Sequence, residues 1–387
     1  MAQISWLSNY LNNSRLSNWS SVKDQNPPTI YQVVILITLE IAGIAGNTLA
    51  IVMTVKMLRY KGNLPQVLIL YLSLADLLTV LCSYTPSIIA QFILIPHSFF
   101  YPSHWLCQFQ AFTMMTLLYY SSGMIVIMSI ERLLAIKMPV WYKVNFKRKT
   151  VYIFMAITLI CCVMFNLLPL FGVCQLSIHF NSTCFWDWDL TNPGTKLYSY
   201  TVVFLSIILV VAIFIINIIT ITIVKRKNKI ADSQGRRPIT ESRATGVLVS
   251  TGFLFIISWL PFSVVILLHQ TGNTKSMDPQ QVELMDYVTF RLTCLNCCIN
   301  CFVYGLINNE HRHRYLMLIK RPFRTCNNIT TEEYESAFKP NAYKQSGQLS
   351  TRVQMFQATA IVLATSHTCI DKAANKYRHN KIYSTSE

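Results

Sequence analysis

The sequence predicts an all-α membrane protein: seven transmembrane helices in one bundle, with a short amphipathic eighth helix on the cytoplasmic side. The 387-residue chain is 52% hydrophobic and only 13% charged, and its mean hydropathy of +0.38 is too high for an ordinary soluble protein. Seven apolar stretches are each long enough to cross a ~30 Å hydrocarbon core as a helix of roughly 20 residues. They cover about residues 31–58, 66–95, 105–136, 150–173, 198–225, 244–270 and 284–307.

Basic residues lie on alternate connections between these stretches and predict the orientation. Of the 33 Lys and Arg residues, 28 lie in or beside the C-terminal tail and the connections that follow the first, third and fifth stretches. The other five are Arg15, Lys23, Lys196, Lys275 and Arg291. This bias predicts a multi-pass plasma-membrane protein with its N-terminus outside the cell. The net charge of +16 then reflects topology and attraction to the anionic inner leaflet, so it indicates no nucleic-acid partner.

We expect three regions along the chain. Residues 1–30 form an extracellular glycosylated tail, 31–325 form the seven-transmembrane domain, and 326–387 form a disordered cytoplasmic tail. The start of the chain lacks a basic segment followed by an apolar run, so the first apolar stretch is expected to serve as the signal anchor. After the seventh stretch, "NNEHRHRYLMLIKRPF" mixes apolar and basic residues in a pattern typical of an amphipathic helix on the inner membrane surface.

Short motifs predict covalent modification on both sides of the membrane. Sequons at Asn12, Asn18 and Asn181 fall on the predicted outside, where glycans are added. A fourth match, at Asn328, would be cytoplasmic and is interpreted as chance. Cys326 follows the amphipathic stretch and is a candidate for palmitoylation, which would make the chain a lipoprotein.

Polar side chains inside the apolar stretches are candidate functional residues, because each is costly in a bilayer. They are Glu40, Asn47, Asp76, Glu131, Arg132, Asn166, Asn217, Arg291, Asn296 and Asn300. Several belong to longer motifs: "GNTLAIV", "LSLADLL", "SIERLLAIKMPVWY" and, on the sixth stretch, "FLFIISWLPF". The order and spacing of these motifs resemble those of the rhodopsin-like (class A) G-protein-coupled receptors across nearly all of residues 30–325.

The resemblance implies a receptor, not an enzyme, that needs no cofactor and passes an extracellular signal to a heterotrimeric G protein. Arrestin and receptor kinases are further expected partners of the cytoplasmic tail. A transporter or channel would be expected to show internal repeats or a path lined by acids, and we find no internal repeat. A receptor-shaped scaffold or decoy that does not signal stays an alternative, because Asn300 precedes Cys301 where the family has proline.

Glu131 and Arg132 lie at the predicted cytoplasmic end of the third stretch. By position alone they are either a partly desolvated charge pair or side chains that snorkel to the membrane interface. The resemblance implies that Arg132 is locked in the resting state and released to meet the G protein. It also implies a second lock carboxylate at Glu241 and further switch residues at Asn300 and Tyr304. A bistable contact of this kind is what a ligand-driven population shift requires.

Asp76 is the deepest acid in the predicted bundle. An unpaired buried carboxylate is costly, so Asp76 should be bound by Asn47, Asn296, Asn300, water or a cation. The resemblance implies a sodium ion at this site in the inactive state. A neutral Asp76 in a polar network without an ion is the alternative.

Pro261 predicts a kink in the sixth helix, because proline removes a backbone donor. Trp259 beside the kink is most simply a packing residue. The resemblance implies more, namely that Trp259 forms the floor of the ligand pocket. Together with Phe255 it would couple ligand contact to movement of this helix.

Cysteine is used in two ways. The resemblance pairs Cys107, at the outer start of the third stretch, with Cys184 or Cys174 of the second outer loop, and Cys184 matches the family better. Four more cysteines lie on one stripe of the seventh helix: Cys294, Cys297, Cys298 and Cys301. One straight helix cannot fold four such thiols around a tetrahedral metal, so we interpret them as packing residues.

Matched positions also bear on the ligand. Met114 stands where amine receptors carry an aspartate and Cys294 where opsins carry the retinal lysine. These residues argue against an amine held by that salt bridge and against retinal held by a Schiff base. The stretches "SSGMIVIMSIERLLAI", "NLLPLFGV", "CFWDW" and "YSYTVVFLS" carry a weaker resemblance to the prostanoid receptors, particularly those for prostaglandin E. That resemblance implies that Arg291 binds an anionic head group bidentately. Alternatively Arg291 snorkels outward or pairs with Asp286 or Glu283. The expected ligand is a prostanoid-like or other acidic lipid, in contact with Met114, Trp259 and Arg291, and a peptide is the alternative.

Overall fold

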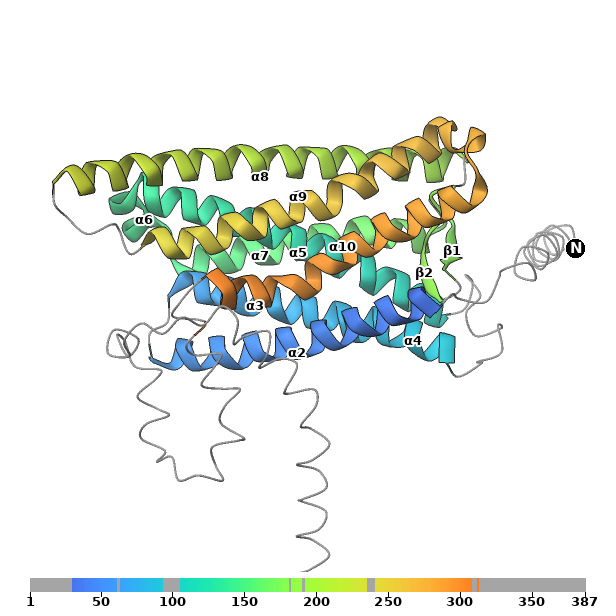
Figure 1. Ribbon diagram of the computed structural model, residues 1–387, viewed down its shortest axis with the longest axis horizontal. Coiled ribbons are helices and arrows are strands. Elements are labelled where there is room, and N and C mark those ends of the chain that lie inside the picture. Colours follow the sequence, from blue (N-terminus) through green and yellow to red (C-terminus); the bar gives the residue numbers. More distant parts are fainter. Residues whose placement is uncertain are drawn as a thin grey trace, which may run out of the picture.

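The computed structural model is a bundle of seven membrane-length helices with a β-hairpin at one end (Figure 1). It describes residues 30–60, 63–92, 105–180, 182–189, 192–234, 241–307 and 312, with the backbone alone for 60, 90–92, 241–245, 247–248, 301 and 304–307. The seven spans are α2 (Ile30–Tyr60), α3 (Leu64–Thr79) with α4 (Thr85–Phe92), α5 (Trp105–Lys137), α7 (Arg148–Leu170), α8 (Pro193–Ser233), α9 (Glu241–Thr271) and α10 (Pro279–Ile307). The predicted bundle is confirmed, whereas the predicted eighth helix lies outside the described residues.

The helices close into a ring. α2 packs against α3, α3 against α5, α5 against α7 and α8, α8 against α9, α9 against α10, and α10 back against α2. Because α5 also contacts α9, it crosses the middle of the bundle and supplies much of the core. Among the residues with described side chains, six spans are apolar and long enough to cross a membrane by length and composition. α10 has 29 residues and is therefore about 43 Å long, which also suffices.

The second span contains a π-helical turn, η1 (Val80–Tyr84), between α3 and α4. Pro86 follows this turn, and in a continuous α-helix its ring would clash with the carbonyl group one turn earlier. The wider turn relieves this, because the N–H of Thr85 donates to the carbonyl of Val80, five residues back. The Tyr84 hydroxyl then donates to the carbonyl of Cys294 at 3.0 Å, which joins this span to α10.

α8 is longer at both ends than the apolar stretch predicted. At its start, the N–H of Thr195 donates to Oδ1 of Asn192 at 2.7 Å, and Pro193 occupies the first turn. At its other end the helix continues to Ser233 through "KRKNKIADS". Lysine and arginine are good helix formers, but hydropathy does not register a helix that continues beyond the apolar layer.

A hairpin, absent from our predictions, covers one end of the bundle. β1 (Leu176–His179) pairs antiparallel with β2 (Thr183–Trp186), and every residue of β2 is buried. We call the end that carries β1 and β2 the hairpin end. We call the opposite end, where the short helix α6 (Pro139–Asn145) follows α5, the Arg132 end (Figure 1).

Candidate functional site

Arg291 is buried near the hairpin end of α10, with only 5% of its surface exposed. Three aromatic rings surround its guanidinium group. The guanidinium carbon lies 5.1 Å from the ring centre of Tyr287, 5.5 Å from that of Phe290 and 5.6 Å from that of Phe180. Cation–π contacts hold an arginine without neutralising it. The Nε atom of Arg291 is buried and has no hydrogen-bond partner among the described residues.

This geometry disagrees with both alternatives for Arg291, namely a side chain that snorkels outward and an ion pair with Asp286 or Glu283. Its low exposure is incompatible with a side chain that snorkels outward. Asp286 is bound elsewhere: its Oδ1 lies 2.8 Å from Nε2 of His269, and its Oδ2 accepts a hydrogen bond from Nε1 of Trp188 at 3.4 Å. In the described part of the chain Arg291 forms no ion pair, with Glu283 or any other acid. Arg291 is thus a buried cation available to an anionic ligand.

An aromatic layer lies between the hairpin and helices α9 and α10. The ring centre of Phe185 lies 5.2 Å from that of Phe290, and the ring centres of Trp186 and Trp188 lie 6.2 and 5.5 Å from that of Phe262. Edge-to-face contacts at these separations stabilise a packed aromatic cluster. An apolar layer beside a buried cation suits a ligand with an acidic head and an apolar body.

Two connections fix the hairpin to the bundle. Cys107 at the start of α5 is bonded to Cys184 of β2, and the other candidate, Cys174, is a buried free thiol. Gln110, one turn along α5, accepts the N–H of Cys184 at 3.0 Å and donates to the carbonyl of Ser83 at 2.7 Å. We did not single out Gln110 from the sequence, although an amide inside an apolar stretch was a usable signal.

Trp259 lies in the core between α5 and α9. Its ring centre is 5.7 Å from that of Phe255 and 5.8 Å from that of Tyr119. Pro261 stands inside α9 two residues further on, and Met114 is fully buried in the same core. Trp259 and Met114 thus share one core, and both the pocket floor and the roles of these residues in ligand response remain predictions.

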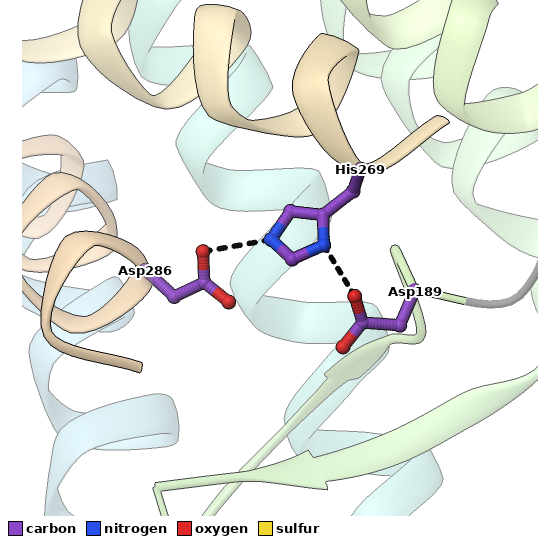
Figure 2. Close-up of side chains that lie close together, drawn as sticks. All are labelled: Asp189, His269 and Asp286. Carbon is purple, nitrogen blue, oxygen red and sulfur yellow. Dashed lines mark hydrogen bonds and ion pairs between the residues drawn. The ribbon is translucent and has the colours of Figure 1, made fainter. Parts of the chain in front are cut away.

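Three charged side chains from separate elements meet at the hairpin end (Figure 2). They are Asp189, after β2, His269, near the end of α9, and Asp286, on α10. The His269 ring contacts Asp189 through Nδ1 and Asp286 through Nε2, the latter at 2.8 Å, so the two carboxylates lie on opposite sides of the ring. Asp189 and His269 were not predicted as site residues from the sequence, because charged residues at the end of a span are usually solvated.

Two ionisable side chains in the connection between α7 and α8, Asp189 and His179, have shifted pKa values. Burial raises the pKa of the Asp189 carboxyl group, but the hydrogen bond and the charge of His269 more than offset this, so the pKa of Asp189 lies below its ordinary value. His179 stacks on Trp188 with ring centres 3.6 Å apart, and burial lowers the pKa of His179 to about 4. His179 is therefore neutral near pH 7.

Asp76 is fully buried between α3, α5 and α10. Its Oδ1 accepts a hydrogen bond from Oγ of Ser121 at 2.7 Å, and its Oδ2 accepts one from Nδ2 of Asn300 at 3.0 Å. Asn47 instead donates to the carbonyl of Cys297 at 2.9 Å, and within the described residues Asn296 forms no hydrogen bond with Asp76. The structure thus adds Ser121 to the predicted network and leaves Asn47 and Asn296 outside the direct partners of the carboxylate.

The donor set around Asp76 fits a sodium ion. It includes a carboxylate, a hydroxyl and an amide, and the amide oxygens of Asn296 and Asn300 are buried without a hydrogen-bond partner in the described chain. Hard cations prefer such oxygen ligands. Asp76, Ser121 and Asn300 would hold the ion, which would neutralise the buried charge of Asp76.

Glu131 and Arg132 form a buried charge pair at the Arg132 end. Nε of Arg132 lies 2.7 Å from Oε2 of Glu131, and Nη2 donates to Oε1 at 3.3 Å. The Tyr142 hydroxyl of α6 also donates to Oε1 of Glu131. Glu131 is fully buried and Arg132 nearly so, which favours the desolvated pair over snorkelling side chains.

Several predicted residues cannot be placed. The side chains of Glu241 and Tyr304 are outside those described, so the contact between Glu241 and Arg132 stays a prediction. The same holds for the modification sites Asn12, Asn18, Asn181 and Cys326, which all lie outside the described residues.

The cysteine stripe of α10 packs against its neighbours. Cys294, Cys297 and Cys298 are buried, and Sγ of Cys298 lies 3.3 Å from the carbonyl oxygen of Leu39 in α2. The backbone of α10 is helical through Cys301, consistent with the N–H that cysteine retains there.

Most of the chain resembles known receptors in sequence and fold. Residues 46–304 match the family model described as "7 transmembrane receptor (rhodopsin family)". Free fatty acid receptor 3 of Rattus norvegicus is 23% identical over 295 residues, covering 74% of this chain and 86% of that protein. The prostaglandin E2 receptor EP3 subtype of Oryctolagus cuniculus is 26% identical over 306 residues, covering 73% of this chain and 74% of that protein.

A peptide-receptor relative and a solved structure extend the comparison. Formyl peptide receptor-related sequence 6 of Mus musculus is 26% identical over 300 residues, covering 74% of this chain and 84% of that protein. The crystal structure of squid rhodopsin superposes with a TM-score of 0.64 at 16% identity, covering 85% of this chain and 94% of that one. The match to the family model spans most of the bundle, from α2 to α10, so this chain belongs to the rhodopsin family of seven-transmembrane receptors.

Proposed function

We propose that this chain is a plasma-membrane receptor for an acidic lipid, with its hairpin end outside the cell and its Arg132 end facing a heterotrimeric G protein. The observation that carries the proposal is Arg291, a buried arginine that has aromatic neighbours and no carboxylate partner in the described chain. Burying an uncompensated charge is costly, so a site of this kind favours an anionic ligand.

Two relatives support this ligand class. They are free fatty acid receptor 3 and the prostaglandin E2 receptor EP3 subtype, and both named ligands are carboxylic acids with apolar bodies. Formyl peptide receptor-related sequence 6 matches about as well, so a peptide remains the competing ligand class. The buried cation and the aromatic layer next to it favour the lipid.

In this proposal the ligand carboxylate binds the guanidinium of Arg291 bidentately. The apolar body packs against the aromatic layer and extends toward Trp259. A ligand that contacts Trp259 better in one position of α9 than in another shifts the population of the two states. In this proposal the contacts of Glu131 with Arg132 and Tyr142 belong to the resting state, and the shift exchanges them for contacts with the G protein.

A ligand screen with a matched pair of variants tests the proposal. Fatty acids, prostanoids and a peptide library are applied to cells, and G-protein activation is measured. An acidic lipid should activate the wild type, and Arg291→Ala should reduce its potency on the order of 100-fold, because truncating one member of a buried charge pair costs about 2–5 kcal/mol. Lys275→Ala is the control, since Lys275 is an exposed cation at the same end.

The methyl ester of the active lipid adds a second control. The ester lacks the charge, so its potency should be low and equal on wild type and Arg291→Ala. An acidic lipid that activates both receptors with equal potency contradicts the carboxylate contact. Activation by peptides alone contradicts the ligand class.

A further inference from the structure

The cluster of Asp189, His269 and Asp286 has the form of a metal site with its supporting shell (Figure 2). Each residue offers a ligand atom, and these atoms lie within 4.8 Å of one another. Oδ1 of Asp286 lies 2.8 Å from Nε2 of His269, and its Oδ2 accepts from Nε1 of Trp188. A carboxylate that accepts the N–H of a histidine fixes the ring and its tautomer. With Nε2–H bound to Asp286, a metal ion between Nδ1 and Asp189 would replace the proton that these two groups share.

We propose that the hairpin end binds a Zn²⁺ ion through Nδ1 of His269 and the carboxylate of Asp189, with Asp286 as the group that orients the histidine ring. Water molecules complete the coordination. The proposal goes beyond the acidic-lipid function and does not rest on it.

The contacts of the ring agree with this assignment. Asp189 already contacts Nδ1 of His269, and Oγ1 of Thr274 lies 3.4 Å from the same nitrogen. In tetrahedral zinc sites with bonds near 2.0–2.1 Å, neighbouring ligand atoms are about 3.3 Å apart. The Asp189 side chain is 65% exposed, so a small rotation of it opens this space without disturbing the buried Asp286.

Ligand chemistry selects the class of metal. Imidazole with a carboxylate suits Zn²⁺, whereas Mg²⁺ and Ca²⁺ prefer sites made of oxygen alone. The exposed side of Asp189 gives the ion a path from solvent. Two carboxylates facing one ring carry a net negative charge even when the ring is a cation, and a divalent ion on a neutral ring cancels it.

A bound ion would add a direct link between three elements. Asp189 follows β2, His269 is near the end of α9 and Asp286 lies on α10. Trp188, next to Asp189, has its carbonyl bound by Gln270 of α9 at 2.7 Å. Zinc at this position would hold the hairpin against α9 and α10 and stabilise the folded hairpin end.

The test uses the full-length receptor purified in lipid nanodiscs, with Zn²⁺ as the only added ligand. Isothermal titration and the melting temperature are measured against Zn²⁺ concentration. Any ligand that binds only the folded state raises its stability, so the wild type should show a saturable rise in Tm. Asp189→Asn, an exposed change that preserves shape, should remove the response, and Asp286→Asn should weaken the Zn²⁺ affinity at least about ten-fold.

The control is Asp278→Asn, which removes a negative charge at an exposed position just before α10. This variant should bind Zn²⁺ like the wild type. Equal Zn²⁺ responses in wild type and Asp189→Asn would overturn the proposal, as would the lack of a response in the wild type. A response to Ca²⁺ or Mg²⁺ as strong as that to Zn²⁺ would overturn the choice of metal.

Discussion

Asn300 donates a hydrogen bond from Nδ2 to Oδ2 of Asp76 across 3.0 Å, and this contact joins α10 to α3 inside the bundle. The two residues are 224 positions apart in the sequence. The bond lies directly before Cys301, where α10 keeps a regular helical backbone. The link between the buried acid and the seventh span is therefore present although the family proline is not.

Asp76→Asn tests whether the buried carboxylate holds sodium. The amide can still accept the Ser121 hydroxyl but lacks the charge that attracts a cation. In the wild type, replacing choline with sodium should lower agonist affinity, because sodium favours the inactive state. The variant should show the same affinity in both salts. Agonist binding in membranes measures this, and a sodium effect that persists in Asp76→Asn contradicts the assignment.

Arg132→Ala should abolish agonist-driven activation of the G protein while surface expression persists. Arg132 is the only cation bound to Glu131 in the described chain, and the family resemblance assigns it the contact with the G protein. Nucleotide exchange in membranes that contain equal amounts of receptor is the measurement. Intact signalling would contradict the lock mechanism. Lys137→Ala, at the last turn of the same helix, is the control.

Tyr142→Phe should raise basal activity. Its hydroxyl donates to Oε1 of Glu131, and a hydrogen bond to a charged group contributes about 1.5–3 kcal/mol. If that bond exists only in the resting state, its loss increases the active fraction on the order of 10-fold. Ligand-free nucleotide exchange reports the change. Unchanged basal exchange would mean that the bond persists in the active state.

Gln110→Ala should loosen the hairpin. The change leaves the buried N–H of Cys184 and the carbonyl of Ser83 without their partner, which costs roughly 1–3 kcal/mol. We expect a lower melting temperature of the purified receptor and faster dissociation of the ligand. Gln281→Ala, an exposed glutamine in the first turn of α10, should behave like the wild type. Equal melting temperatures for Gln110→Ala and the wild type would contradict this role.

His179 should make the hairpin end less stable in acid. Burial lowers the pKa of His179 to about 4 from an ordinary value near 6.5, so the folded state binds fewer protons than the unfolded state between these pH values. The contribution of this pKa shift to the free energy of unfolding is complete above pH 6.5 and is lost as the pH drops toward 4. It amounts to roughly 3 kcal/mol in total. The melting temperature should therefore fall less between pH 7 and pH 4.5 in His179→Gln than in the wild type. Identical pH profiles would contradict the prediction.

How much the sequence predicts depends on the range of the interaction. Hydropathy locates all seven spans, because burial in lipid acts on each segment by itself. It misses the π-helical turn before Pro86 and the last turns of α8, where local backbone chemistry decides. The motifs select Asp76, Arg132 and Trp259 and include Tyr142. They do not predict that Ser121 binds Asp76 or that Tyr142 binds Glu131, because these contacts form only when α5 and α6 are in place.

The sequence by itself determined the class of the protein, the number of its spans and which polar residues lie inside them; all of these except the partly buried Glu40 are buried. Only the tertiary structure decided which side chains meet. It joined Cys107 to Cys184, left Arg291 without an acid, and brought Asp189, His269 and Asp286 together from a loop and two helices. The physical reason is that hydrophobicity is a sum over one segment, whereas a hydrogen bond or an ion pair depends on ångström-scale distances between segments that are far apart in the chain.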